Sequence, residues 1–109
     1  MSAAWWMLLG AGALEIVWAM LFKRAFQNDH TITAITLAAM AASFALLAEA
    51  MKSIPVGTAY AIWTGIGAVG AAVFGILIYK EPATAARIAC IALIVAGIAG
   101  LKLTSATGP

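Results

Sequence analysis

The chain contains four apolar runs, each long enough to cross a lipid bilayer, and this feature constrains its fold most. Roughly 20 mostly apolar residues span the hydrocarbon core as a helix. The first run is interrupted only by Glu15 and the last only by Arg87. We expect one four-helix membrane domain over residues 1–109, with spans near 3–22, 31–49, 54–79 and 83–102 and a frayed polar tail at 104–109.

The composition predicts an all-α integral membrane protein. Hydrophobic residues make up 65% of the 109 residues and charged residues 9%, whereas about a quarter of the residues in soluble proteins are charged. No segment alternates apolar and polar residues as a membrane barrel strand must. Helices satisfy their own backbone polar groups, as lipid requires. Little of the chain is left for a soluble domain.

The reactive side chains are too few for enzyme chemistry. The net charge is +2 without a basic block, so we expect no nucleic-acid partner. Cys90 is the only cysteine, and His30 lies in a polar loop without neighbouring metal ligands, so neither an internal disulfide nor a metal site is expected. No nucleophile–base pair or phosphate loop is recognisable, and we expect neither enzymatic activity nor a cofactor.

The cationic residues set membrane orientation only weakly. Four spans place both termini on one side of the membrane. Six cations divide two to four between the side of the termini and the opposite side: Lys52 and Lys102 against Lys23, Arg24, Lys80 and Arg87. The positive-inside rule then slightly favours external termini. The imbalance is small enough for insertion in both orientations.

Small residues recur every four positions in the third and fourth runs. The stripes are Gly57, Ala61 and Gly65; Gly67, Ala71 and Gly75; and Ala92, Ala96 and Gly100. Such stripes let helix backbones approach closely in lipid, and glycine also makes a helix easier to bend. Because four helices can hardly enclose a cavity and seal it from lipid, we expect the chain to form a dimer.

Glu15 is the residue most suited to carry function. It lies past the middle of the first run, where carboxylates usually face a water-filled cavity and serve transport. Because burial disfavours the charged form, such a group can hold a proton, and once ionised it attracts a cation. The alternatives are a glutamate tolerated near a helix end or one that only joins helices together.

Aromatic and small residues share helical faces with functional candidates. Gly12 and Trp18 lie three residues either side of Glu15. Gly12 is expected to leave space, and Trp18 to offer an aromatic wall with one N–H donor. Tyr60, Trp63 and Gly67 share a face of the third run, which suits a pocket for a flat cation, although ordinary packing produces the same pattern.

Ser43, Glu49 and Lys102 are three further polar residues within or at the ends of the apolar runs. Ser43 is the deepest hydroxyl of the second run and either lines the pocket or bonds to a carbonyl of its own helix. Glu49 ends that run beside Lys52 and is interpreted as interfacial, with a second ionisable site as the alternative. Lys102 ends the last run, where its side chain can extend to the membrane surface.

Three segments resemble the small multidrug resistance transporters, and more closely their guanidinium-exporter branch. They are Leu14–Ala19 (LEIVWA), Pro55–Ala71 (PVGTAYAIWTGIGAVGA) and Gly97–Lys102 (GIAGLK). The resemblance covers nearly the whole chain, and its third-run segment is long and specific. It implies four helices per subunit, an antiparallel dual-topology dimer in the bacterial inner membrane, and export of guanidinium-type cations driven by proton influx.

The resemblance also implies roles for individual residues. The central glutamate of the family corresponds to Glu15, and its pocket residues correspond to Gly12, Trp18, Ser43, Tyr60 and Trp63. The lysine typical of the guanidinium branch corresponds to Lys102. Gly65, Gly67, Gly97 and Gly100 are expected to serve helix bending and packing. Two Glu15 carboxylates, oriented by hydrogen bonds from Ser43, Tyr60 and Trp63, would bind protons or substrate alternately.

Other interpretations stay open at the level of sequence. Glu49 stands where an apolar or aromatic residue is expected, and the loop Arg24–His30 lacks an expected glycine. These departures allow a substituted guanidinium as substrate, or a heterodimer with a related subunit instead of a homodimer. The alternative functions are a broad exporter of hydrophobic or quaternary ammonium cations and a non-transporting membrane subunit.

Overall fold

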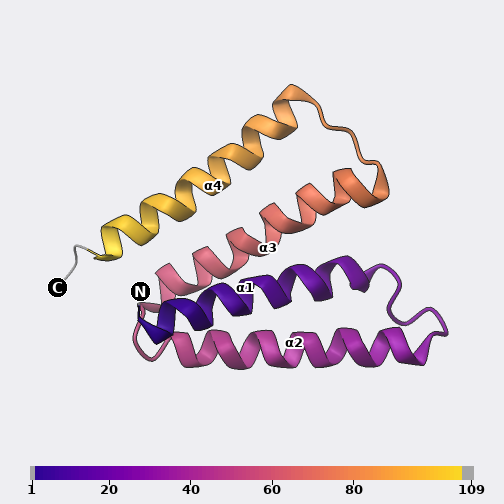
Figure 1. The fold of residues 1–109 in the computed structure, drawn as a ribbon, viewed down its shortest axis with the longest axis horizontal. Coiled ribbons are helices and arrows are strands. Elements are labelled where there is room, and N and C mark those ends of the chain that lie inside the picture. The colour runs from indigo at the N-terminus through magenta and orange to yellow at the C-terminus, as the bar shows by residue number, and fades with distance from the viewer. Residues whose placement is uncertain (1, 107–109) are drawn as a thin grey trace.

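The computed structural model describes residues 2–106 and contains four helices. They are α1 (Ala3–Phe22), α2 (His30–Ala50), α3 (Val56–Tyr79) and α4 (Ala85–Ala106). All four are long and apolar enough to cross a membrane, and residues 2–106 include no strand. The predicted all-α membrane fold is confirmed. Successive helices run in opposite directions, so α1 begins and α4 ends at the same end of the molecule (Figure 1).

Local chemistry explains where the helices begin and end. The Asp29 side chain caps α2 by accepting hydrogen bonds from the backbone N–H groups of Thr31 and Ile32. Pro55 occupies the N-cap position of α3, and its ring cannot continue a helix backwards. Lys80 adopts left-handed backbone angles at the end of α3, which terminates that helix.

Several predicted boundaries differ from the structure by a few residues. Helix α2 ends at Ala50 and not at residue 49, α3 begins at Val56 and not at residue 54, and α4 begins at Ala85 and not at residue 83. His30, expected in a polar loop, is the first residue of α2. Residues 104–106, assigned to the polar tail, continue α4. The Thr104 hydroxyl hydrogen-bonds to the carbonyl groups of Gly100 and Leu101, so this polar side chain is satisfied within the helix. Residues 107–109 of the predicted tail lie outside the described residues.

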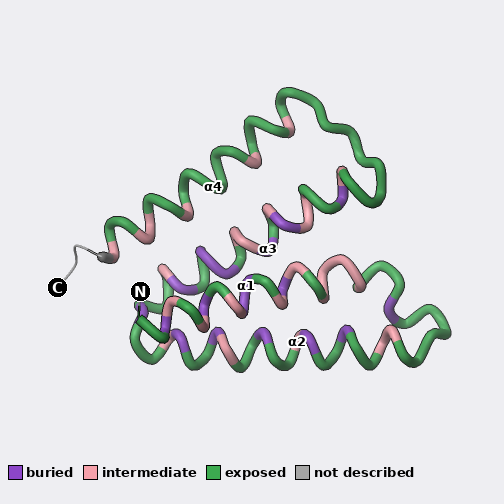
Figure 2. The backbone as a smooth tube through the Cα atoms, in the orientation of Figure 1, coloured by how far each residue is buried: buried purple, intermediate pink, exposed green. Residues whose placement is uncertain are grey.

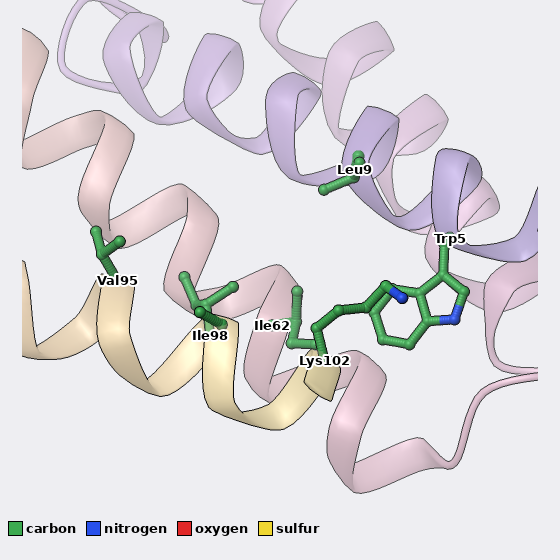
Figure 3. Close-up of a pocket in the computed structure, with 7 residues that line it drawn as sticks. Trp5, Leu9, Ile62, Val95, Ile98 and Lys102 are labelled. Atoms are coloured by element: carbon green, nitrogen blue, oxygen red, sulfur yellow. The ribbon is translucent and has the colours of Figure 1, made fainter. Parts of the chain in front are cut away.

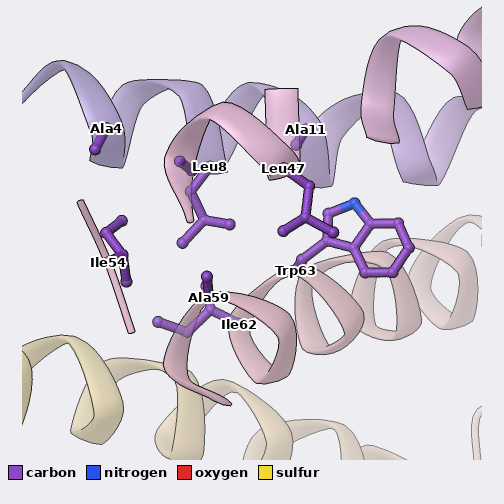
Figure 4. Packing of buried hydrophobic residues seen from close by; sticks show 9 residues of the cluster. Ala4, Leu8, Ala11, Leu47, Ile54, Ala59, Ile62 and Trp63 are labelled. Carbon is purple, nitrogen blue, oxygen red and sulfur yellow. The ribbon is translucent and has the colours of Figure 1, made fainter. Parts of the chain in front are cut away.

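The core lies between α1, α2 and α3. Figure 2 shows the buried residues along these three helices. Figure 4 shows the apolar cluster that they form. Its members are Ala4, Leu8, Ala11, Leu47, Ala50, Ile54, Ala59, Ile62 and Trp63. Alanines alternate with larger side chains in this cluster, so the helices approach closely.

Helix α4 diverges from the other three. It packs against α3 (Figure 1), and none of its residues 85–105 is buried. The side chains of Ile94 and Ile98 reach the surface of α3 at Gly65. Large apolar side chains such as Leu93 and Leu103 remain about 70% exposed, at 71% and 68%. Such an apolar surface is compatible with contact to lipid or to another apolar helix, because neither needs polar partners from it.

Candidate functional site

Glu15 is buried on α1 and faces α3 at Gly67. Only 9% of Glu15 is exposed. A Cβ atom on residue 67 would overlap the Glu15 carboxyl group, so the carboxyl lies directly against the α3 backbone. The grouping of residues on helical faces by their sequence spacing did not predict this contact. It exists because glycine alone leaves room for the carboxyl group there.

The Glu15 carboxyl group has unused binding capacity. Its Oε1 atom is buried without a hydrogen-bond partner among the described residues. The ion pairs of the described chain lie elsewhere, between Lys52 and Glu49 and between Arg87 and Glu81. An unpaired buried carboxylate is costly, so this group is suited to hold a proton or to receive a cation.

Ser43 connects three helices through two hydrogen bonds. Its hydroxyl donates to the Ala11 carbonyl at 2.7 Å and accepts from the Trp63 indole N–H at 3.0 Å. Ser43 is fully buried. Figure 4 shows the Trp63 ring beside Leu47 of α2. The alternative that Ser43 bonds to its own helix is therefore wrong. This network fixes α1, α2 and α3 one helical turn from Glu15.

Six aromatic rings form a continuous series that involves α1, α2 and α3. They contact one another in the order Phe26, Phe22, Trp18, Phe44, Trp63 and Tyr60, with centroid separations of 5.5–6.2 Å. Trp18 contacts its neighbours edge to face, and its indole N–H is buried without a partner among the described residues. Phe44 and Tyr60 are 45% and 48% exposed. An exposed aromatic surface of this kind can attract organic cations.

Two sequence-based expectations about the site need correction. Gly12 does not leave open space, because Ile66 of α3 occupies it, 2.7 Å from the position of an added Cβ atom. Ser43 donates to the Ala11 carbonyl and accepts from the Trp63 indole N–H, and the structure shows no hydrogen bond from Ser43 or Trp63 to Glu15. Lys102, expected to extend to the membrane surface, lies over the Trp5 ring at the end of the molecule, 4.4 Å from the ring centroid.

The glycines expected to serve bending and packing separate into two groups. Gly65 packs against Ile98 of α4 and Gly67 against Glu15. A side chain at Gly97 or Gly100 would meet nothing within 4 Å. Helix α3 is continuous through its glycines. Gly65 and Gly67 therefore serve close packing in this conformation, whereas Gly97 and Gly100 of α4 face open space.

The remaining candidates lie on the surface. Glu49 pairs with Lys52 at 2.7 Å, with 52% of its side chain exposed, which agrees with the interfacial interpretation. Cys90 and His30 are exposed. No cluster of possible metal ligands occurs among the described residues.

Several site residues were missed by sequence reasoning. Phe22 follows Trp18 by four positions, so helical spacing could have identified it. Phe44 and Ile66 belong to α2 and α3, so helical spacing along α1 could not identify them. The Ala11 carbonyl is a backbone group, which no sequence pattern marks. Their places depend on how the helices pack against one another.

The chain is similar to known proteins over most of its length. A model of the family "Small Multidrug Resistance protein" matches residues 3–94. A guanidinium exporter of Yersinia pseudotuberculosis is 56% identical over 103 residues, which cover 94% of this chain and 99% of that protein. Guanidinium exporters of Salmonella typhimurium and Escherichia coli are 56% and 55% identical, covering 94% of this chain and 98% of each relative.

Proposed function

The chain belongs to the small multidrug resistance family, and on that premise we propose that it exports guanidinium or a small substituted guanidinium in exchange for protons. It is a multi-pass transporter of the bacterial inner membrane and not an enzyme. In this proposal, Glu15 binds both the proton and the cation.

The observation that carries the proposal is the buried Glu15 carboxyl group against Gly67, whose Oε1 atom has no hydrogen-bond partner among the described residues. Guanidinium is planar and offers N–H donors in a fork that a carboxylate accepts with two oxygens. Trp18, about one helical turn from Glu15 on α1, belongs to the series of aromatic rings, and aromatic faces attract flat cations. Guanidinium exporters over 50% identical to the chain support this choice of cation.

Proton coupling follows from competition at the same group. A carboxyl group holds either a proton or a cationic partner, because the proton removes the negative charge that attracts the cation. If Glu15 alternates between the two, influx of protons drives export without a separate proton site. Movement of helices around a fixed midplane site would expose Glu15 to each side in turn.

The shape of one chain supports an obligatory dimer. Its extents are 49 × 35 × 18 Å, so it is only about two helices thick, since a helix with its side chains measures about 10–12 Å across. We propose an antiparallel homodimer in which the two Glu15 residues share one pocket. The open faces at Gly97 and Gly100 support α4 as a contact between subunits. A related partner subunit is the alternative.

The broader export of quaternary ammonium compounds is the second candidate. The exposed rings of Phe44 and Tyr60 favour it, since they could contact bulky apolar substituents. The buried Ser43–Trp63 hydrogen bond favours the narrower substrate, because it fixes the Trp63 ring rigidly.

Transport by the reconstituted protein tests the proposal. Wild-type liposomes should give proton-coupled currents with guanidinium and much smaller currents with a quaternary ammonium dye. Glu15→Gln should abolish these currents, because it cannot ionise, while the surface variant Glu49→Gln should retain them. Proton-coupled exchange by Glu15→Gln would contradict the mechanism. Equal currents with the dye would indicate the broad exporter, and an absence of current the non-transporting subunit.

A further inference from the structure

An apolar cavity lies between α1, α3 and α4, away from Glu15. Its volume is about 260 Å³, and its walls include Leu9 of α1, Ile62 of α3, and Val95 and Ile98 of α4 (Figure 3). The residues that line it are apolar or aromatic except Lys102. It exists because α4 packs its backbone against α3 and not against α1.

One end of the cavity carries a positive charge. The Lys102 side chain extends from the last turns of α4 towards α1, and its Nζ atom lies 4.4 Å from the Trp5 ring centroid (Figure 3). Tryptophan and lysine near helix ends are typical of the membrane–water interface. The cavity therefore extends from an interfacial ammonium group into the apolar depth of the membrane.

We propose that this cavity binds an anionic phospholipid, with one acyl chain between α1 and α4 and the phosphate at Lys102. Apolar cavities are not filled by water, and a gap between membrane helices is open to lipid tails. A lysine near the surface attracts anionic headgroups. This inference goes beyond the proposed function and does not depend on it.

Other occupants fit the cavity poorly. A guanidinium-type cation would meet apolar walls and the ammonium group of Lys102, which repels it. A helix from a second copy would need a passage about 10 Å wide. The contact between Trp5 and Lys102 closes the end of the cavity through which such a helix would have to pass. A flexible acyl chain requires neither polar partners nor a passage of that width.

Native mass spectrometry of the purified full-length protein tests the proposal. The probes are phosphatidylglycerol and phosphatidylcholine, added to the protein in mild detergent. Wild type should retain phosphatidylglycerol in preference. Lys102→Gln should reduce that preference about fivefold, which corresponds to the roughly 1 kcal/mol that one lysine contributes near an anionic surface. Lys102→Arg should keep the preference, as should Lys80→Gln at the other end of the molecule.

A second variant tests the acyl-chain part of the site. Ala99 lines the cavity, so Ala99→Leu should displace the lipid while Lys102 is still present. Ala85→Leu, on the first turn of α4 and outside the cavity, is the matched control and should bind as wild type does. A photoreactive residue at position 95 should capture phosphatidylglycerol from liposomes. Equal retention of both lipids, unchanged preference in Lys102→Gln, or capture of a second protein chain at position 95 would overturn the proposal.

Discussion

Gly67 of α3 lies where any side chain would overlap the carboxyl group of Glu15. The Glu15 carboxyl group and the small-residue stripe of α3 are therefore parts of one contact. The atoms that a Cβ atom at position 67 would overlap belong to the flexible Glu15 side chain and not to the backbone. A larger residue at position 67 would thus displace the carboxyl group while the helices keep their positions.

The first prediction concerns Gly67→Ala. The added methyl group should move the Glu15 carboxyl group and reduce guanidinium transport about a hundredfold, since misplacement by about 1 Å can have that effect. Thermal stability in detergent should change little. Gly57→Ala is the matched control, because its methyl group would meet nothing within 4 Å. Full transport by Gly67→Ala would show that the carboxyl group acts from another position.

The second prediction concerns the contact between Gly12 and Ile66. Gly12→Ala should destabilise the protein by about 1–3 kcal/mol, the usual cost of overpacking, because the methyl group would lie 2.7 Å from an Ile66 carbon. Ile66→Ala alone should leave a cavity. In the double variant the two effects should partly cancel, which thermal unfolding of all four proteins would measure. Strict additivity of the two changes would contradict the predicted contact.

The sequence was sufficient for the fold because lipid leaves few alternatives. Four apolar runs, with Pro55 and Pro82 near their boundaries, dictate helices at nearly the observed positions. Glu15 could also be identified as anomalous, since an intramembrane carboxylate needs a reason.

The contacts of the site could not be predicted to the same degree. Helical spacing places Gly12, Glu15 and Trp18 on one face, but it does not say which α3 residue each one meets. Gly12 meets Ile66 and not open space. Ser43 meets Ala11 and Trp63 and not Glu15. These outcomes depend on the rotation of each helix about its axis, which packing decides.

The third prediction concerns the hydroxyl of Ser43. Ser43→Ala should destabilise the protein by about 1–3 kcal/mol, because it leaves the buried Trp63 N–H without an acceptor. Thr36→Val is the matched control on the same helix. Thr36 is fully buried and donates to the Ile32 carbonyl of its own helix, so its replacement should cost less. Equal stability losses in the two variants, measured by thermal unfolding, would contradict the interhelical role of Ser43.

The fourth prediction tests α4 as the contact between subunits. Gly97→Leu should leave each four-helix chain folded, because a side chain there meets nothing within 4 Å, but it should weaken dimerisation at least tenfold if two α4 helices pack closely. Energy transfer between labelled subunits in liposomes would measure the effect. Gly57→Leu, at another open glycine on α3, should dimerise as wild type does. Unchanged dimerisation of Gly97→Leu would place the contact on another helix.

The fifth prediction follows from competition between protons and substrate at Glu15. Lowering the pH should weaken guanidinium binding, because each protonated carboxyl group must release its proton before it can pair with the cation. Across the pH range in which the carboxyl groups titrate, the apparent Kd should rise by up to about tenfold per pH unit for each proton displaced. Calorimetric titrations in buffers of different ionisation enthalpy would report both the Kd and the protons released. Glu15→Asp keeps a carboxyl group and should retain the pH dependence with weaker binding, whereas Glu15→Gln should lose proton release entirely. A Kd independent of pH in the wild type would show that protons and guanidinium bind at separate sites.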